Sequence, residues 1–155
     1  MNDGSQGGGG AGRPREGRRA DKRELEEGSA LALDFAKLDS VRGVAPVVVQ
    51  HADTRDVLLL AYTDESALRE TLARRRLVLY STSRRERWEK GATSGCRFEL
   101  VEARVNCEQN SLLYLVRPWP EGADHGICHT KDGTGRHRQT CFYRRIDPES
   151  GTLSR

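Results

Sequence analysis

The chain has 155 residues, with 26 lysines and arginines against 23 aspartates and glutamates, and a formal net charge of +3. A chain of this length forms one domain with a proper core, and so small a charge excess argues against nucleic acid as a partner. No apolar run is long enough to cross a bilayer, and the polar beginning of the chain lacks the apolar stretch of a secretory signal. We expect a cytoplasmic protein with no membrane partner.

Residues 1–28 are expected to be a disordered tail. They contain the run Gly7–Gly10, several arginines and almost no apolar side chains, so they cannot bury enough surface to offset the entropy of ordering. Their basic residues are offset by acidic ones, unlike those of a nucleic-acid-binding arm. We expect the folded domain to span residues 29–148 and a short tail to follow at 149–155.

The first part of that domain alternates strand and helix patterns. The β-branched residues at 47–49 and the apolar run 57–62 flank a polar turn, which predicts a hairpin. Thr63 or Asp64 can cap a helix that ends near Arg75, because apolar residues recur at helical spacing between them.

The second part is richer in strands. Residues 77–81 predict a strand, and the polar, glycine-punctuated segment 83–95 predicts a loop. Residues 98–106 alternate between apolar and charged side chains, which is typical of a strand with one buried face. Further strands are expected at 112–116 and 142–146, with a glycine-rich loop between them. The pattern favours an α+β fold with a mostly antiparallel or mixed curved sheet and one or two helices.

Three of the four cysteines, Cys107, Cys128 and Cys141, indicate a metal centre. A reducing cytoplasm disfavours structural disulfides, so metal binding gains weight. Three thiolates with an open fourth position suit a catalytic zinc. No two of these cysteines lie two to four residues apart, which excludes a zinc finger or ribbon. The three must converge through tertiary structure or across a subunit boundary.

Four segments follow one another in the order of a known family. They are the stretch 49–62, the stretch 80–95 that ends in Lys90-Gly91-Ala92-Thr93-Ser94-Gly95, the motif 106–110, and Cys128-His129-Thr130 with Cys141-Phe142. Over roughly residues 45–146, together they resemble the phosphoribosyl-AMP cyclohydrolase family of histidine biosynthesis. The second segment is long and specific, whereas any one of the others alone would be weak.

The resemblance implies an obligate-type homodimer that hydrolytically opens the purine ring of 1-(5-phosphoribosyl)-AMP, a small-molecule nucleotide. It implies a zinc held by Cys107, Cys128 and Cys141, contributed across the dimer, and a magnesium held by aspartates. Zinc can lower the pKa of a bound water from 15.7 to about 7, which makes hydroxide available for attack on an adenine carbon. His129, next to a zinc ligand, is the expected catalytic proton shuttle.

Residues 83–95 are the expected binding site for the nucleotide phosphate. The segment combines cationic side chains with hydroxyl groups and exposed backbone N–H groups, and this mixture suits a phosphate. The expected substrate-binding residues are Arg84, Lys90, Thr93 and Ser94.

The motif around Cys107 departs from the family pattern. The family has aspartates where this chain has Asn106, Glu108 and Asn110. In a strand these three side chains would share one face, and Cys107 would point to the other. The formal charge of that face falls from −3 to −1, so we do not expect tightly held magnesium at this degenerate second-metal site. A weaker ion, shared with the substrate phosphate, stays open.

Two more departures lie near the expected site. Cys128 and Cys141 have twelve residues between them, more than the family usually has, and the added segment around 131–138 is basic. Ala92 replaces a usual glutamate, and Cys96 stands where asparagine or histidine is common. These changes leave two alternatives open. One is a divergent paralogue that hydrolyses another nucleotide or heterocycle; the other is a non-catalytic binding module whose zinc is held by all four cysteines.

Simpler structural interpretations also stand. Residues 106–110 suit a polar hairpin turn, Cys107 could be a buried structural thiol, and Cys96 an inert or substrate-adjacent one. The aromatic residues considered are assigned to the core or an interface: Trp88, Trp119 and Tyr114. The histidines outside the cysteine motif are assigned to solvated loops: His51, His125 and His137.

Overall fold

The computed structural model describes residues 43–154, so the expectation of a disordered tail at 1–28 lies outside the described residues. Its centre is a six-stranded sheet in the order β4-β3-β2-β1-β6-β5. The strands are β1 (Ala45–His51), β2 (Val57–Thr63), β3 (Val78–Ser81), β4 (Glu86–Glu89), β5 (Arg97–Val105) and β6 (Leu112–Trp119). Only β1 and β6 run parallel within this sheet. The expected α+β fold with a mixed, mostly antiparallel sheet is therefore confirmed.

The hairpin predicted from two apolar runs is β1–β2. Its strands pair from Ala45↔Thr63 to Gln50↔Val57, with an irregularity after Val49. Val47 and Val49 are fully buried, while Val48 between them is not, because successive side chains of a strand point to opposite faces. The alternation places one face of β1 in the core.

The predicted helix is α2 (Glu65–Arg74), and Asp64 is its N-cap. The Asp64 carboxylate accepts a hydrogen bond from the Ala67 N–H at 2.7 Å, which satisfies one of the free donors of the first turn. At the other end Arg75 adopts a left-handed conformation with φ of 54° and ends the helix. Thr71 fixes the helix to β3, because its hydroxyl donates to the Val78 carbonyl at 2.8 Å.

A β-bulge in β5 explains which of its side chains are buried. The pairing with β6 shifts between Leu100 and Glu102, so Val101 is an extra residue. Before the bulge, Phe98 and Leu100 face the core. Val101 in the bulge and Ala103 after it are partly buried. The predicted alternation of apolar and charged residues thus holds, but the bulge changes its phase.

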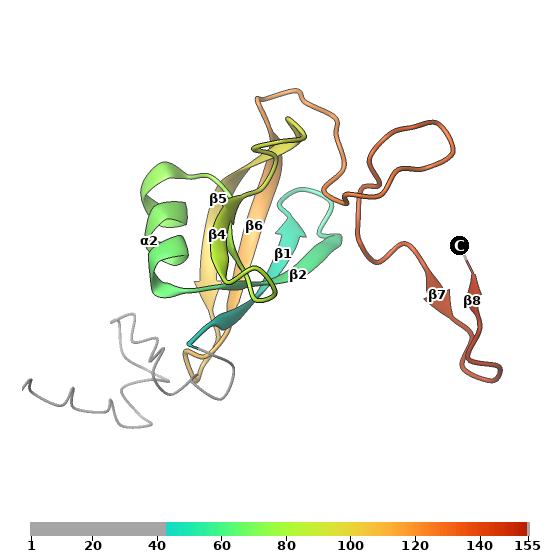
Figure 1. The fold of residues 1–155 in the computed structure, drawn as a ribbon, viewed down its shortest axis with the longest axis horizontal. Coiled ribbons are helices and arrows are strands. Elements are labelled where there is room, and N and C mark those ends of the chain that lie inside the picture. Colours follow the sequence, from blue (N-terminus) through green and yellow to red (C-terminus); the bar gives the residue numbers. More distant parts are fainter. Residues whose placement is uncertain (1–42, 155) are drawn as a thin grey trace, which may run out of the picture.

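The sheet curls until its two ends approach each other. An isolated bridge joins Arg76, just before β3, to Glu99 of β5, and the Leu77 N–H donates to the Phe98 carbonyl at 3.2 Å. Figure 1 shows α2 on one side of this curved sheet and the segment after β6 on the other. The core has as its largest buried members Tyr114, Phe98, Leu77, Leu79 and Leu100. Tyr114 is thus a core residue, as expected, while Trp88 and Trp119 are half-buried.

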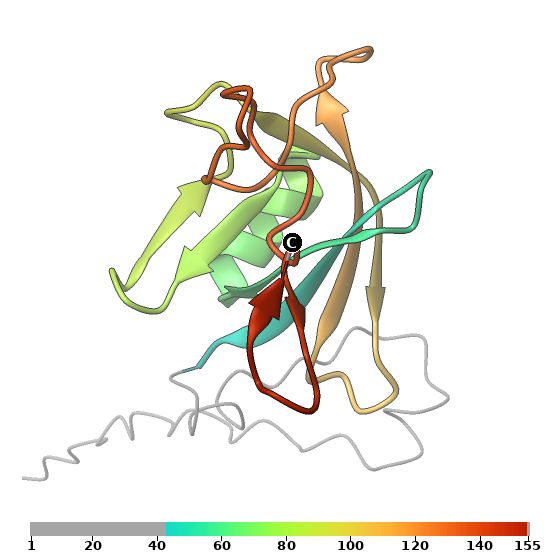
Figure 2. The ribbon, with the colours of Figure 1, turned by 90° about the vertical axis from the view of Figure 1, so that its right-hand side faces the viewer.

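Two parts of the structure differ from the sequence-based expectation. The segment 83–95 is not all loop, because β4 within it pairs with β3. The last strand is shorter than 142–146: it is β7 (Arg145–Ile146), paired with β8 (Leu153–Ser154) in a separate hairpin. This hairpin stands apart from the main sheet in Figure 1 and lies in front of it in the turned view of Figure 2. Among residues 43–154 no helix is long and apolar enough to cross a membrane.

Candidate metal centre

Two of the three predicted zinc ligands, Cys128 and Cys141, lie together. The loop after β6 carries Cys128, whose backbone N–H donates to the Arg138 carbonyl at 3.0 Å. The N–H of Cys141 donates to the Leu58 carbonyl of β2 at 2.8 Å, and the Thr140 hydroxyl bonds the Val57 carbonyl at 2.8 Å. The chain is thus fixed to β2 immediately before and at the second cysteine.

The added segment between them forms a loop with its own hydrogen bonds. Lys131 and His137 form an antiparallel bridge, and the Arg138 N–H donates to the Thr130 carbonyl at 3.0 Å. One Asp132 oxygen accepts from the N–H and the hydroxyl of Thr134 at 2.8 and 2.7 Å. The extra residues therefore leave the centre and return to it, which lets the two cysteines meet despite their separation in sequence.

A glycine makes this return possible. A Cβ on Gly126 would lie 2.1 Å from the Arg138 carbonyl oxygen and 2.3 Å from that of His137. Such contacts are far below van der Waals distance, so any larger residue would push the two backbone segments apart. Gly126 therefore allows the segment that carries Cys128 to lie close to the backbone of residues 137–138.

Cys128 is the thiol that ionises more easily. It is buried, and burial by itself would raise its pKa. Hydrogen bonds from the Thr130 hydroxyl at 3.0 Å and backbone N–H at 3.4 Å, a hydrogen bond from Cys141, and the charge of Arg138 outweigh that effect and lower the pKa of Cys128. Nearby donors and a cation thus favour the thiolate that a metal needs.

Cys141 behaves in the opposite way. The residue is exposed, yet partial desolvation of its sulfur and the neighbouring charge of Cys128 raise the pKa of Cys141 to about 11. Lys90 partly opposes this rise. The two shifts run in opposite directions, so Cys128 is the sulfur of the pair that loses its proton more easily.

Lys90 lies beside the cysteines and is buried, with 8% of its surface exposed. Burial lowers its pKa, and the charges of Cys96, Cys141 and Cys128 act against that shift. Gly91 allows this arrangement: its φ is +86°, and a Cβ there would lie 2.3 Å from the Cys96 carbonyl carbon. The ammonium group of Lys90 therefore interacts electrostatically with three cysteines. Its assignment to phosphate binding stays a prediction.

Cys107 lies far from Cys128 and Cys141 in the fold. It is exposed, and it sits in the turn between β5 and β6. Cys96 comes directly before the first residue of β5, and Cys107 comes two residues after its last. At about 3.3 Å per residue, this nine-residue strand places Cys96 and Cys107 roughly 25 Å apart. Figure 1 shows the β5–β6 turn and the loop after β6 at opposite ends of the sheet. One chain therefore cannot bring Cys107 to Cys128 and Cys141, and four cysteines of one chain cannot share a metal.

The residues present fit half of a zinc site. Two cysteine sulfurs in contact, one favoured as a thiolate and both near a compensating ammonium group, suit a soft divalent cation. Within residues 43–154, no three His, Cys, Asp or Glu side chains of the chain come together as a metal site. A zinc site with a third protein ligand would therefore need a residue from a second chain.

The remaining predicted site residues are divided between two places. His129 is exposed beside Cys128, and Thr93 and Ser94 lie in the exposed loop that ends at the buried Cys96. The Ser94 hydroxyl accepts from the Cys96 N–H at 3.3 Å. Arg84 lies at the opposite end of β4, where its Nε contacts Glu86 at 3.1 Å.

Several residues near the centre have roles that sequence reasoning missed. Thr130 follows Cys128 by two residues, a spacing at which a hydroxyl can reach back to a sulfur. The Nδ1 atom of His137 lies 2.8 Å from the Cys128 carbonyl oxygen, and His125 Nε2 lies 2.7 Å from the Arg97 carbonyl oxygen. Both histidines are half-buried. They lie in the loop after β6, as expected, but each is partly buried and has a hydrogen bond with the backbone.

The segment 106–110 is a turn and not a strand. β5 ends at Val105, and Gln109 adopts a left-handed conformation with φ of 52°. The prediction that strand alternation separates Cys107 from its neighbours was wrong for that reason, whereas the hairpin-turn interpretation is confirmed. Exposure of Cys107 also excludes a buried structural thiol.

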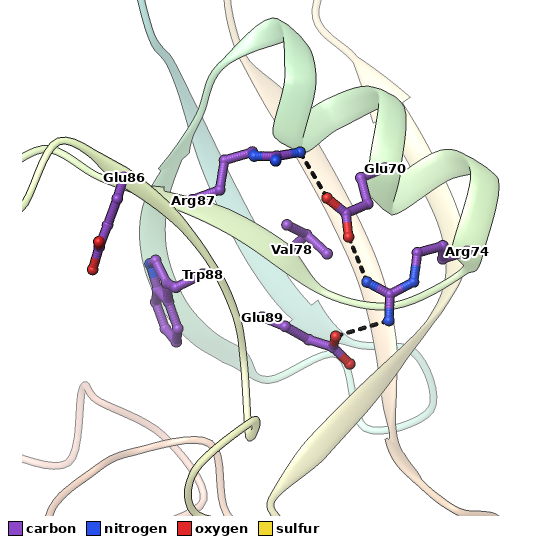
Figure 3. Close-up of a pocket in the computed structure, with 7 residues that line it drawn as sticks. All are labelled: Glu70, Arg74, Val78, Glu86, Arg87, Trp88 and Glu89. Carbon is purple, nitrogen blue, oxygen red and sulfur yellow. Dashed lines mark hydrogen bonds and ion pairs between the residues drawn. The ribbon is translucent and has the colours of Figure 1, made fainter.

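A surface pocket of about 430 Å³ lies between α2 and β4, away from the cysteines. Figure 3 shows Arg87 paired with Glu70, and Arg74 paired with both Glu70 and Glu89. The Arg87–Glu70 and Arg74–Glu89 distances are 2.8 and 2.9 Å. Four of the five charged groups that line the pocket pair with one another, and the fifth, Glu86, pairs with Arg84. We therefore assign the pocket to holding α2 against β4 and not to substrate.

The fold and this centre define an α+β protein with a close pair of cysteines beside a buried lysine. Comparison with known proteins gives the family: the profile of phosphoribosyl-AMP cyclohydrolase matches residues 59–143. A phosphoribosyl-AMP cyclohydrolase of Caulobacter vibrioides is 39% identical over 132 residues, covering 85% of this chain and 84% of the relative. One from Halobacterium salinarum is 41% identical over 121 residues, covering 76% and 85%.

A third relative is a two-function protein. The histidine biosynthesis bifunctional protein HisIE of Thermus thermophilus is 42% identical over 116 residues, which cover 75% of this chain and 49% of that protein. The chain belongs to the phosphoribosyl-AMP cyclohydrolase family. It is an enzyme of the hydrolase class, and the resemblance noted from the four sequence segments is confirmed.

Proposed function

We propose that the chain is a zinc-dependent phosphoribosyl-AMP cyclohydrolase, which opens the purine ring of 1-(5-phosphoribosyl)-AMP in histidine biosynthesis. Family membership supports the reaction, and the pairing of Cys128 with Cys141 beside Lys90 is the structural observation that carries the zinc assignment. We place the reaction in the cytoplasm, where the four free cysteines stay reduced.

In this proposal Cys128 and Cys141 of one subunit and Cys107 of the partner subunit hold the zinc. When bound, zinc supplies Lewis acidity that activates water for attack on the ring. Thr130 and Arg138 lower the pKa of Cys128 and so favour its deprotonation on binding, and the nearby Lys90 would offset negative charge on the sulfurs. Because each chain contributes to two sites, the homodimer carries two equivalent centres.

Exposed apolar side chains near both halves of the site support the dimer. On the side of Cys141 these are Val57, Leu60, Phe142, Ile146 and Leu153, and Val105 lies two residues before Cys107. Ile146 is 72% exposed and Phe142 60% exposed. Large apolar groups so exposed are typical of a surface that a partner covers. A second copy of the chain accounts both for this surface and for the missing ligand.

His129 is the proposed proton carrier. Its imidazole is exposed next to Cys128, so it can take a proton from the attacking water and deliver it to a ring nitrogen as the ring opens. Replacing it is expected to lower kcat by about 10²- to 10⁴-fold without loss of zinc. Thr93 and Ser94 offer hydroxyl and N–H groups to the substrate phosphate from the loop beside Lys90, and Arg84 adds charge at the other end of β4.

The test is direct. The zinc-loaded enzyme is incubated with phosphoribosyl-AMP, with and without added magnesium, and ring opening is followed by its ultraviolet change. Turnover in either condition supports the proposal, and no turnover in both removes the assigned substrate.

A second candidate function, hydrolysis of another nucleotide or heterocycle, is favoured by the added loop at 131–138. This basic loop begins two residues after His129 and carries Lys131, Arg136 and Arg138 next to the centre. A panel of purine nucleotides assayed beside phosphoribosyl-AMP distinguishes the two candidates.

A further inference from the structure

The turn that carries Cys107 is held together by its own side chains. The Oδ1 atom of Asn106 accepts hydrogen bonds from the backbone N–H groups of Asn110 and Ser111 at 2.9 and 3.0 Å. The Asn106 N–H donates to the Ser111 carbonyl at 3.1 Å, and the Gln109 N–H donates to the Asn106 carbonyl at 3.0 Å. Asn106 thus closes the turn through both its backbone and its side chain.

The side chains that replace the family's aspartates bond to one another in one direction. The Nδ2 atom of Asn106 donates to Oδ1 of Asn110 at 2.7 Å. The Nδ2 atom of Asn110 in turn donates to Oε2 of Glu108 at 3.1 Å. Each contact joins an amide donor to an oxygen acceptor, and the chain of donors ends on the single carboxylate.

Aspartates could not make these two contacts. An ionised carboxylate only accepts hydrogen bonds, so aspartates at 106 and 110 would place unprotonated oxygens against each other where the amides now donate. Three carboxylates so close repel one another unless a cation lies among them. In this turn the two amide N–H groups therefore take the place of the divalent cation that would neutralise a set of carboxylates.

A magnesium ion does not fit the residues present. Three side-chain oxygens of the cluster, one each from Asn106, Asn110 and Glu108, already accept hydrogen bonds. The cluster carries one formal negative charge, and magnesium demands near-octahedral oxygen ligands and loses its waters reluctantly. Binding would have to break the contacts that hold the turn.

We propose that Asn106, Asn110 and Glu108 replace the second metal with an internal hydrogen-bond network, so that the turn presents Cys107 without any divalent cation. Asn106 and Asn110 are then positioning residues for Cys107, and magnesium has no site here. The proposal deepens the proposed function, since Cys107 is a proposed zinc ligand, but its main readouts require neither turnover nor bound zinc.

The experiment compares the natural chain with the variant Asn106→Asp/Glu108→Asp/Asn110→Asp, each full-length and supplied with zinc. Thermal melting is recorded with and without millimolar magnesium, and manganese binding is measured by electron paramagnetic resonance. The Tm of the natural chain should not change with magnesium, and it should bind no manganese in the turn. The variant should melt at least about 2–4 °C lower without magnesium, recover most of that loss when magnesium is added, and bind manganese.

Zinc affinity separates positioning of Cys107 from simple stabilisation. Without magnesium the variant should bind zinc about 10- to 100-fold more weakly, and magnesium should restore the affinity. The control Ser150→Ala removes a 2.9 Å hydrogen bond to Asp147 from another exposed turn. Its Tm should not respond to magnesium.

Two results would overturn the proposal. One is a natural chain whose Tm rises with magnesium and loses that response in Asn110→Ala. The other is a triple variant whose Tm does not change with magnesium and which binds no manganese, like the natural chain. The two amide groups would then not be the reason that the ion is excluded. If no form of the chain binds zinc, the zinc assignment fails, and the melting and manganese results still decide the present proposal.

Discussion

The side chains of Cys141 and Cys128 are joined by a hydrogen bond, although twelve residues of chain separate them. The contact depends on two anchors, the Arg138 carbonyl for Cys128 and the Leu58 carbonyl for Cys141. The family's third cysteine, Cys107, lies at the other end of the β5–β6 hairpin. A site that needs all three must be built from two chains.

Thr130→Val tests how the protein prepares Cys128 for a metal. The substitution removes the hydroxyl that lies 3.0 Å from the sulfur, so the pKa of Cys128 should rise and zinc affinity should fall by about 10- to 100-fold. Competition with a chelator measures the affinity. Thr134→Val is the matched control, because its hydroxyl bonds Asp132 in the same loop without touching a cysteine. Equal losses in both variants would count against the role of Thr130.

Gly126→Ala should push the loop segment that carries Cys128 away from residues 137–138. The new methyl group would meet backbone carbonyls at 2.1 and 2.3 Å, and the resulting strain is expected to lower the free energy of unfolding by about 1–3 kcal/mol. Urea unfolding measures it. Gly133→Ala, in the same loop but with open space around its Cβ position, should change stability by less than about 0.5 kcal/mol. A tolerated alanine at 126 would show that the close approach is not needed.

Charges on the β7–β8 hairpin should break the dimer. Ile146 and Leu153 face each other across its two strands, and both are exposed. The double variant Ile146→Asp/Leu153→Asp is expected to sediment as a monomer and to lose zinc, because each chain alone lacks the third ligand. The control Leu72→Asp changes an apolar side chain of α2 that is 41% exposed, and this variant should remain dimeric. An intact dimer in the hairpin variant would place the interface elsewhere.

The ion pair of Asp53 with Arg117 predicts part of the acid sensitivity. Two hydrogen bonds from Arg117, at 2.7 and 2.8 Å, lower the pKa of Asp53 below its usual value. A carboxyl whose pKa is lower in the folded state stabilises the fold above its unfolded pKa of about 3.9, and that contribution is lost as the pH falls further. Asp53→Asn should therefore destabilise the protein at neutral pH and weaken the loss of stability below about pH 4. Arg117→Gln should do the same, and thermal melting across pH measures both.

Local patterns predicted the fold better than they predicted the site. The cap at Asp64, the alternation in β1 and the helix from 65 to 74 depend on neighbours in sequence, so they could be read in advance. β4 could not, because Glu86–Glu89 has no apolar alternation and becomes a strand by pairing with β3. The bulge at Val101 likewise depends on the register with β6.

The site was predicted by residue type and missed in arrangement. The cysteine motifs gave candidate ligands through a family resemblance, but the distances between these cysteines are properties of the folded chain. Lys90 was assigned to phosphate because its loop is polar, while the structure places it beside three cysteines. The Asn106–Asn110 segment allowed both a strand and a hairpin turn, and the structure with its left-handed Gln109 shows the turn.

The most direct test of the shared site is subunit complementation. Cys107→Ala and Cys141→Ala chains are each purified as homodimers, then unfolded, mixed and refolded together. Each homodimer should lack both zinc sites, whereas a mixed dimer regains one intact site, made by Cys107 of one chain with Cys128 and Cys141 of the other. Random mixing should therefore restore about a quarter of the zinc and of the hydrolase activity of the natural enzyme. Zinc content and activity that stay at the level of the separate variants after mixing would contradict a site shared between subunits.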